Sequence, residues 1–279
     1  IVVGMARLRL AQKRHAEAKA CLERALKVYG DALPPGHPMV ADAQLTMARF
    51  HSLQRQPAKA EALRREALAS EEKAWGASNP FTIRTLFGVG TSCREQGKSE
   101  EAEEAHRQAL SLCREHHGGN SQLVQRAMVQ LEVTLLAQRK YEEAGELASK
   151  ALGLAEKEHG ADHVEVVQPL LTLAKAQRLR TRYPEAEASA KRALAIAEQA
   201  DPEDPARVAA ALSGLASVHY YAGECGKAEP VLRRELSIRM ASSSATDLRL
   251  ATVLVNLANA LRSQGKLTEA EPLALEALG

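Results

Sequence analysis

The stretch GKLTEAEPLALEAL, from Gly265 to Leu278, occurs in related form several times along the chain. Earlier versions are GKSEEAEEAHRQAL from Gly97, RKYEEAGELASKAL from Arg139 and TRYPEAEASAKRAL from Thr181. Its last leucine has counterparts at intervals of 42 residues: Leu26, Leu68, Leu110, Leu152, Leu194, Leu236 and Leu278. A period that never slips indicates one repeated structural unit rather than a single functional motif.

Each repeat contains signals for two helices. Upstream of the quoted stretch, apolar residues recur at helical spacing, as in Leu254, Leu257 and Leu261. Helix-ending residues follow the second helix of each repeat, where glycine adopts positive φ readily and proline cannot continue a helix. These residues are Pro34, Gly76, Gly118, Gly160, Pro202 and Ser244. Each repeat is therefore predicted to be a helix, a short turn, a second helix and a loop.

A small residue recurs eight positions before each of these leucines: Ala18, Ala60, Ala102, Ala144, Ala186, Ala228 and Ala270. Two helices joined by a short turn cross closely, and a small side chain at the crossing lets their backbones approach. Leucine at the later position then fills the space towards the next repeat. The residue before that leucine is alanine in every repeat except the sixth, where it is Glu235.

The quoted stretch also contains a proline. Thr268 and Glu271 fit a capping box, which would begin the helix there. Pro272 would then lie in the first helical turn, where a missing N–H costs least. Pro230 occupies the same place one repeat earlier.

The pattern L-x-x-L-A … G-K-x-x-E-A-E-P-L … A-L, preceded by H-P or N-P, resembles the tetratricopeptide repeat. The 42-residue period and the junctions WGASNP and HGADHV are similar to the kinesin-light-chain variety. This resemblance implies an all-α fold, a right-handed α-α superhelical solenoid of stacked antiparallel helix pairs. A HEAT-type array has a similar period, but the fixed small residues favour the tetratricopeptide interpretation.

We expect one solenoid of about six and a half repeats over residues 1–279. The expected repeats are 1–36 (partial), 37–78, 79–120, 121–162, 163–204, 205–246 and 247–279. Solenoids usually have polar capping ends, and none is visible here. We therefore expect the chain to be a fragment of a longer one.

Composition excludes several classes of function. The formal net charge is +2, which argues against a general binder of polyanions such as RNA. No apolar run approaches the roughly 20 residues needed to cross a bilayer, so no membrane association is expected. The four cysteines are scattered without C-x-x-C spacing, which fits a reduced, cytoplasmic protein.

The resemblance implies that the first helix of each pair lines a concave groove. Counting three to four residues along these helices gives candidate groove residues, which are mostly basic or polar. The candidates are Arg49, Arg84, Thr91, Arg94, Arg126, Gln130, Lys175, Arg178, Tyr220, Asn256, Asn259 and Arg262. Gly88 and Gly214 would deepen the groove locally.

Seven basic side chains face one acid, Asp42, in these layers, which predicts an extended, acidic peptide as the ligand. The alternative interpretation, a solvated polar helix face, stays open. Asn256 lies where similar repeats often place an asparagine that bonds the peptide backbone. Tyr220 and Tyr221 are predicted to pack mainly in the groove wall, with a flat contact to a ligand as the alternative.

The sequence shows no catalytic motif. It contains no phosphate-binding loop and no G-x-S-x-G elbow, so no enzyme activity and no cofactor are expected. Cys113, His116 and His117 lack a second ligand pair at zinc-like spacing, and we interpret the histidines as favourable to the helix dipole. His37 and His163 are predicted to cap helices, and His219 to be a packing residue near the groove.

The predicted function is a scaffold or adaptor that binds a protein or peptide partner. Self-association through the uncapped ends and a regulatory role within a larger multidomain protein remain alternatives. RNA binding by helical repeats is less favoured, because the corresponding side chains vary without a code.

Overall fold

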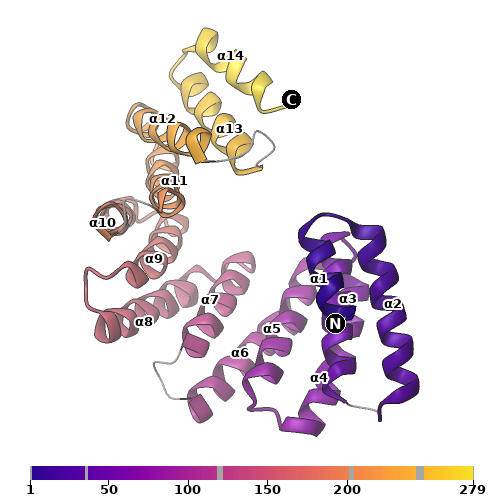
Figure 1. Ribbon diagram of the computed structural model, residues 1–279. Helices are drawn as coiled ribbons and strands as arrows, with labels where there is room; N and C mark the ends of the chain where they lie inside the picture. Colours follow the sequence, from indigo (N-terminus) through magenta and orange to yellow (C-terminus); the bar gives the residue numbers. More distant parts are fainter. Residues whose placement is uncertain (1, 35–36, 118–121, 201–203, 243–247, 279) are drawn as a thin grey trace. The chain divides into compact units, whose positions relative to one another are not determined.

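The computed structural model describes residues 2–34, 37–117, 122–200, 204–242 and 248–278, and within these ranges it contains fourteen α-helices, one 3-10 helix and no β-strand (Figure 1). The first seven helices are α1 (Val2–Ala11), α2 (His15–Ala32), α3 (Pro38–Leu53), α4 (Pro57–Trp75), α5 (Pro80–Glu95), α6 (Ser99–His117) and α7 (Gln122–Ala137). The remainder are α8 (Tyr141–His159), η1 (Val164–Val166), α9 (Val167–Leu179), α10 (Tyr183–Ala200), α11 (Pro205–Tyr221), α12 (Cys225–Ser242), α13 (Leu248–Ser263) and α14 (Leu267–Glu276). The all-α prediction is confirmed.

The chain divides into two compact units. Unit 1 is Ile1–Arg139 and contains α1 to α7, and unit 2 is Lys140–Gly279 and contains α8 to α14. In unit 1, a core formed by Leu22, Met47 and Phe50 joins α2 to α3. In unit 2, Leu232, Leu257 and Leu261 join α12 to α13. Each unit therefore buries its apolar surface between successive helices, as expected of stacked pairs.

The turn between the two helices of a repeat has the same backbone conformation each time. One residue in every turn adopts positive φ: Lys13, Arg55, Gly97, Arg139, Thr181, Gly223 and Gly265. Four of these seven are not glycine and have φ between 55° and 62°. A non-glycine residue in this region costs about 1 kcal/mol, so packing of the flanking helices must hold the turn.

Loop residues begin and end the helices as predicted. His37 and His163 accept hydrogen bonds at their ring nitrogens from the backbone N–H groups of Met39 and Glu165, which confirms their capping role. Helices α4 and α8 end at Gly76 and Gly160, whose φ values are 85° and 99°. The predicted helix-ending residues Gly118, Pro202 and Ser244 lie outside the described residues.

The predicted capping box at Thr268 is wrong. Helix α14 begins at Leu267, directly after the turn, and its N-cap residue is Lys266, which makes no side-chain cap. Pro272 therefore lies inside α14 rather than in its first turn, and Pro230 lies inside α12. The turn at Gly265 makes α14 begin earlier than predicted. Both α12 and α14 therefore continue past a proline, which has no N–H to donate to the carbonyl oxygen four residues before it.

The recurring alanines lie at the closest helix contacts. Ala18, Ala60, Ala102, Ala144, Ala186 and Ala228 have no exposed surface, and Ala270 is 7 % exposed. Neighbours on the same helices, such as Ala62 on α4, are exposed. The need for a small side chain therefore belongs to these buried positions and not to every alanine of the helix.

Ala60→Leu should destabilise the fold by about 1–3 kcal/mol, because the larger side chain forces apart two helices that already touch. The urea midpoint of unfolding measures the loss. Ala62→Leu, on the exposed side of α4, is the matched control and should leave the midpoint nearly unchanged. Equal midpoints for the two variants would contradict the close-crossing model.

Candidate functional site

Unit 1 contains an open cleft of about 890 Å³. Its wall is formed by the first helices of the repeats, α1, α3, α5 and α7, together with side chains that reach in from α4. Predicted groove residues that line this cleft are Arg49, Arg84, Thr91, Arg126 and Gln130. Arg94 does not line it, because it lies one turn beyond Thr91 on α5 and is half-buried there.

The cleft also contains side chains that sequence analysis did not identify. Arg64, Glu71 and Trp75 come from α4, the second helix of its repeat, and Arg7 comes from α1. Arg64 could have been found in the repeat pattern, since no other repeat has an arginine at the equivalent position. The equivalent residues are Leu22, His106, Ala148, Ala190, Leu232 and Ala274.

Arg64 explains the glycine in the middle of α5. Its guanidinium donates to the carbonyl oxygen of Gly88 at 3.2 Å and to Ser52 Oγ at 3.2 Å. A Cβ on residue 88 would lie 2.9 Å from Arg64 Nε, so a side chain there would require the arginine to shift. Gly88 therefore leaves room for Arg64, and it also lines the cleft.

The charge in the unit 1 cleft is predominantly positive. Five arginines (Arg7, Arg49, Arg64, Arg84 and Arg126) line it beside two acids, Asp42 and Glu71. Arg7 pairs with Asp42. Among the described residues, Arg49, Arg84 and Arg126 have no ion-pair partner, and all three are exposed.

Glu71 lies recessed in the same cleft and is only 4 % exposed. Burial raises the pKa of its carboxyl group above the usual value. Trp75 and Phe81 form an exposed aromatic pair at the cleft, with ring centroids 5.7 Å apart. The cleft thus offers unpaired guanidinium groups next to an apolar shelf.

Smaller pockets occur among the described residues of unit 2, and predicted groove residues line two of them. Lys175 and Arg178 line one of about 350 Å³, and Arg178, Tyr220, Asn256 and Asn259 line another of about 420 Å³. Arg262 is exposed and lines neither. A Cβ on Gly214 would lie 2.9 Å from Leu171 Cδ2, so this glycine serves close packing of α11 on α9.

The two tyrosines at the end of α11 differ in how far they are buried. Tyr220 is partly buried against the core of α12 and α13, as predicted for a packing residue. Tyr221 is 58 % exposed, and the guanidinium of Arg178 lies 4.2 Å from the centre of its ring. This cation–π contact holds Arg178 at the pocket.

A family model with the description "Tetratricopeptide repeat" matches residues 2–73, 39–115, 124–199 and 207–279. The chain belongs to the tetratricopeptide repeat family. No curated protein matches it at a significant level. The resemblance inferred from the repeated alanines and leucines is thereby confirmed.

Solved structures of tetratricopeptide type are similar in fold. BtubC (BKLC) from P. vanneervenii is 22 % identical, with a TM-score of 0.65 over 82 % of this chain and 91 % of its own. A Podosopora anserina chain of nearly identical TPR-like repeats, assigned as a kinesin light chain, is 19 % identical, with a TM-score of 0.65 over 70 % and 92 %. NprR in complex with its cognate peptide NprX is 14 % identical, with a TM-score of 0.60 over 99 % and 76 %.

Other predictions concern membrane and metal sites. Among the described residues, no helix combines the length and the apolar character needed to span a bilayer. Cys113 is buried, and burial raises the pKa of its thiol to about 11. His117 Nε2 contacts the backbone oxygen of Ser78 rather than Cys113.

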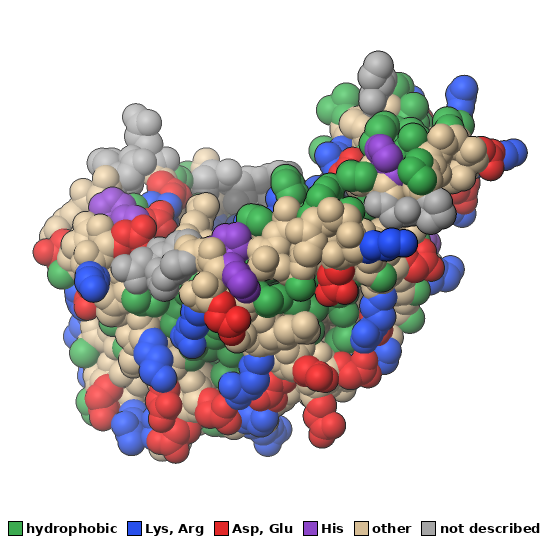
Figure 2. Space-filling model, turned by 90° about the horizontal axis from the view of Figure 1, so that it is seen from below, with side chains coloured by type: hydrophobic (Ala, Val, Ile, Leu, Met, Phe, Trp, Pro, Cys, Tyr) green, Lys and Arg blue, Asp and Glu red, His purple; other side chains and the backbone are tan. Residues whose placement is uncertain are grey.

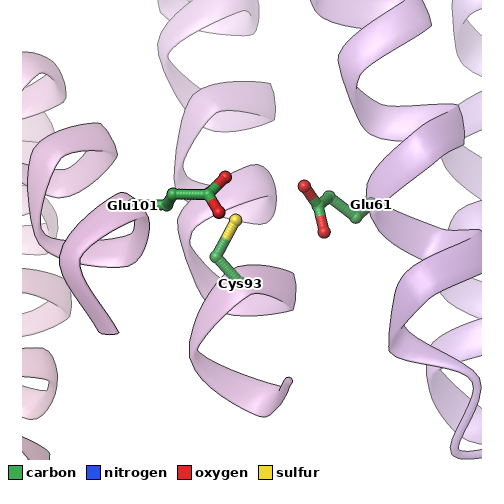
Figure 3. Close-up of side chains that lie close together, drawn as sticks. All are labelled: Glu61, Cys93 and Glu101. Carbon is green, nitrogen blue, oxygen red and sulfur yellow. The ribbon is translucent and has the colours of Figure 1, made fainter. Parts of the chain in front are cut away.

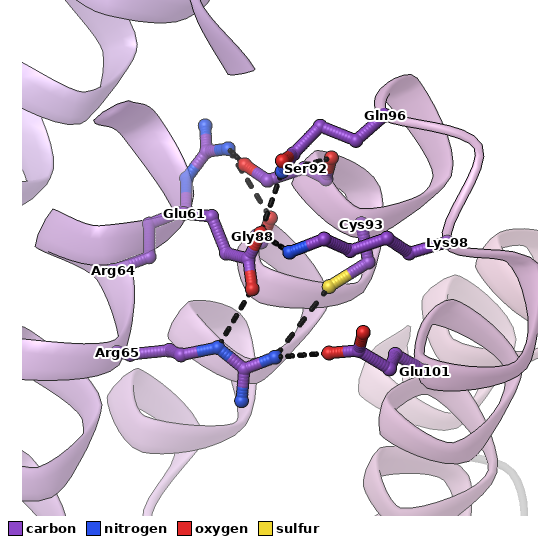
Figure 4. Close-up of polar contacts among 9 residues, drawn as sticks. All are labelled: Glu61, Arg64, Arg65, Gly88, Ser92, Cys93, Gln96, Lys98 and Glu101. Atoms are coloured by element: carbon purple, nitrogen blue, oxygen red, sulfur yellow. Dashed lines mark hydrogen bonds and ion pairs between the residues drawn. The ribbon is translucent and has the colours of Figure 1, made fainter. Parts of the chain in front are cut away.

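The helix pairs of unit 1 are joined by a charge network between their helices. Glu61 on α4 is buried and accepts hydrogen bonds from Arg65 at 2.8 Å, Gln96 at 2.6 Å and Lys98 at 2.8 Å (Figure 4). Arg65 also donates to Glu101 at 2.7 Å. We call these five residues the Glu61 network; it links α4 to α5 and α6.

The network sets the ionisation of Glu61. Burial alone would raise its pKa, but hydrogen bonds from Lys98, Arg65 and Gln96 outweigh burial and lower the pKa from 4.5 to about 2. The same arrangement occurs four repeats later, where Glu229 accepts from Arg233, Gln264 and Lys266. Arg65 and Arg233 thus pair with acids outside the cleft. Figure 2 shows basic and acidic side chains interspersed on the face that it draws.

Glu61→Gln should lower the free energy of unfolding at pH 7 by about 1–3 kcal/mol, since it removes a buried carboxylate that three donors stabilise. The contribution of Glu61 is present above pH 4.5 and is lost as pH falls towards 2. The difference in the free energy of unfolding between wild type and variant, measured by urea unfolding, should therefore decrease below pH 4.5. Glu72→Gln, an exposed change on the same helix, is the control and should show no gap at any pH.

Proposed function

We propose that the chain is a protein-interaction scaffold whose unit 1 cleft binds an extended, acidic peptide segment of a partner protein. One observation carries this proposal. Arg49, Arg84 and Arg126 come from three successive first helices, line one cleft and lack an ion-pair partner among the described residues.

The chemistry of these residues favours carboxylates. A guanidinium presents parallel N–H groups that match a carboxylate, and such charge-assisted pairs are stronger than neutral hydrogen bonds. The other cleft charges are already committed, because Arg7 pairs with Asp42 and Arg64 is held by Gly88 and Ser52. A ligand with several acidic side chains would therefore meet the three unpaired arginines.

Two further features support a peptide rather than a small anion. The cleft is open and spans four helices, so it suits an extended chain. NprR, a structure of similar fold, holds its cognate peptide NprX. Binding of this kind needs no catalytic group, and the four unpaired cysteines are compatible with a reducing compartment such as the cytoplasm.

Charge reversal of Arg49, Arg84 and Arg126 to glutamate should weaken binding of a fluorescein-labelled peptide of alternating Glu and Gly by at least about tenfold. Fluorescence anisotropy of the full chain measures the affinity. The matched control reverses Arg24, Lys59 and Arg114, which are exposed on second helices and change the net charge equally.

Equal losses in the two triple variants would show that net charge, and not the cleft, attracts the peptide. Bulk RNA that displaced the peptide from wild type as effectively as unlabelled peptide would instead support nucleic-acid binding. Unchanged affinity in the cleft variant would overturn the proposal.

A further inference from the structure

The Glu61 network has an altered counterpart in unit 2, three repeats later. Glu187 and Lys191 on α10 correspond to Glu61 and Arg65, and His219 on α11 corresponds to Cys93. In the turn before α12, Glu224 replaces the lysine equivalent to Lys98, and at the start of α12 Lys227 replaces Glu101. A carboxylate therefore faces Glu187 where the Glu61 network places an ammonium group.

His219 lies between the two carboxylates. Its ring is buried, with 4 % of the residue exposed. Nδ1 lies 3.0 Å from Glu224 Oε2, and Nε2 lies 3.9 Å from Glu187 Oε1, which is too long for a hydrogen bond. Among the described residues, Nε2 has no hydrogen-bond partner, although it is directed towards a carboxylate. We call Glu187, His219 and Glu224 the His219 cluster.

The cluster has the spacing of a metal site. One nitrogen or oxygen of each residue lies within 4.8 Å of those of the other two. Zinc binds imidazole nitrogen and carboxylate oxygen at about 2.0–2.2 Å, so ligand atoms around a tetrahedral ion are about 3.3–3.5 Å apart. The 3.0 and 3.9 Å contacts involve different ring nitrogens, and one ion can take only one of them. The carboxylate on the other side of the ring, whose oxygen lies within 4.8 Å, must therefore shift to complete the site.

The equivalent cluster in unit 1 shows why the substitution matters. Glu61, Cys93 and Glu101 also lie close together (Figure 3). There, however, Arg65 donates to both Glu101 and Cys93 Sγ, and Lys98 Nζ lies 2.8 Å from Glu61 (Figure 4). Burial raises the pKa of the Cys93 thiol, which keeps it protonated. That cluster contains its own cations and leaves no place for a metal ion.

Each lysine beside the His219 cluster forms an ion pair with one of its carboxylates. Lys191 pairs with Glu187 at 2.7 Å and Lys227 pairs with Glu224 at 2.8 Å, each within its own segment of chain. Both lysine side chains are more than half exposed, and such surface pairs contribute little. Their long side chains can turn to solvent when a stronger cation enters.

We infer that Glu187, His219 and Glu224 form a Zn²⁺ site that links α10 to α11 and to the turn before α12. The neutral imidazole and the two carboxylates supply three ligands, and water completes the coordination. Any proton on the ligating histidine nitrogen passes to solvent when the metal binds. Bound zinc would join the fifth and sixth repeats, as Lys98 joins the corresponding helices in unit 1.

Isothermal titration of the full chain with ZnCl₂ tests this inference, with Co²⁺ absorption as the spectroscopic check. One Zn²⁺ should bind and raise the melting temperature. Glu224→Lys restores the lysine found in the Glu61 network, so this variant should fold normally without metal and bind Zn²⁺ about 10- to 100-fold more weakly. Glu187→Gln should weaken binding in the same direction.

Two control variants separate the cluster from other ligands. Cys93→Ser changes the equivalent cluster and should leave the zinc affinity unchanged. His163→Gln alters the stacked His159–His163 pair, whose ring centroids are 5.0 Å apart, and should also leave it unchanged. Absence of zinc binding, equal affinity in Glu224→Lys, or loss of binding in either control would overturn the site. The outcome is independent of peptide binding in unit 1.

Discussion

The contact on which the rest of this structure depends is the close crossing of two helices at a buried alanine. The turn before each second helix forces one residue into positive φ, even where that residue is lysine, arginine or threonine. A larger side chain at Ala60 or Ala102 would separate the helices and release the turn. Because this geometry repeats every 42 residues, successive pairs present equivalent faces to one another.

Because the backbone repeats, a side chain that differs from its equivalents in other repeats indicates where one repeat has a different role. Arg64 occupies a position that is apolar in most other repeats, donates to the carbonyl oxygen of Gly88, and projects into the unit 1 cleft. Glu235 replaces the recurrent alanine, is fully buried and pairs with Arg239 at 2.7 Å. Burial raises the pKa of Glu235, because the charged carboxylate loses solvation there. Keeping this ion pair buried therefore costs desolvation free energy, and the pair is a local departure of unit 2 from the repeat pattern.

The two proposed sites arise from the same scaffold in different ways. The unit 1 cleft uses exposed side chains on first helices, where charge can vary without disturbing the core. The His219 cluster lies where one repeat packs on the next, and there a swap of lysine for glutamate changes which cation the structure prefers. Arginines outside the cleft, such as Arg65 and Arg233, form ion pairs with glutamates of neighbouring repeats.

The sequence by itself determined the repeat period, the pairing of helices and the positions of the small buried residues, because each follows from local periodicity. Of the six groove residues that it predicted in unit 1, five line the cleft. It misplaced Arg94 and Pro272, since one helical turn or an earlier helix start moves a residue to another environment. Only the tertiary structure decided which polar groups meet. Glu61 with Lys98, and Glu187 with His219, lie more than thirty residues apart, and no local rule relates their side chains until successive helix pairs are packed together.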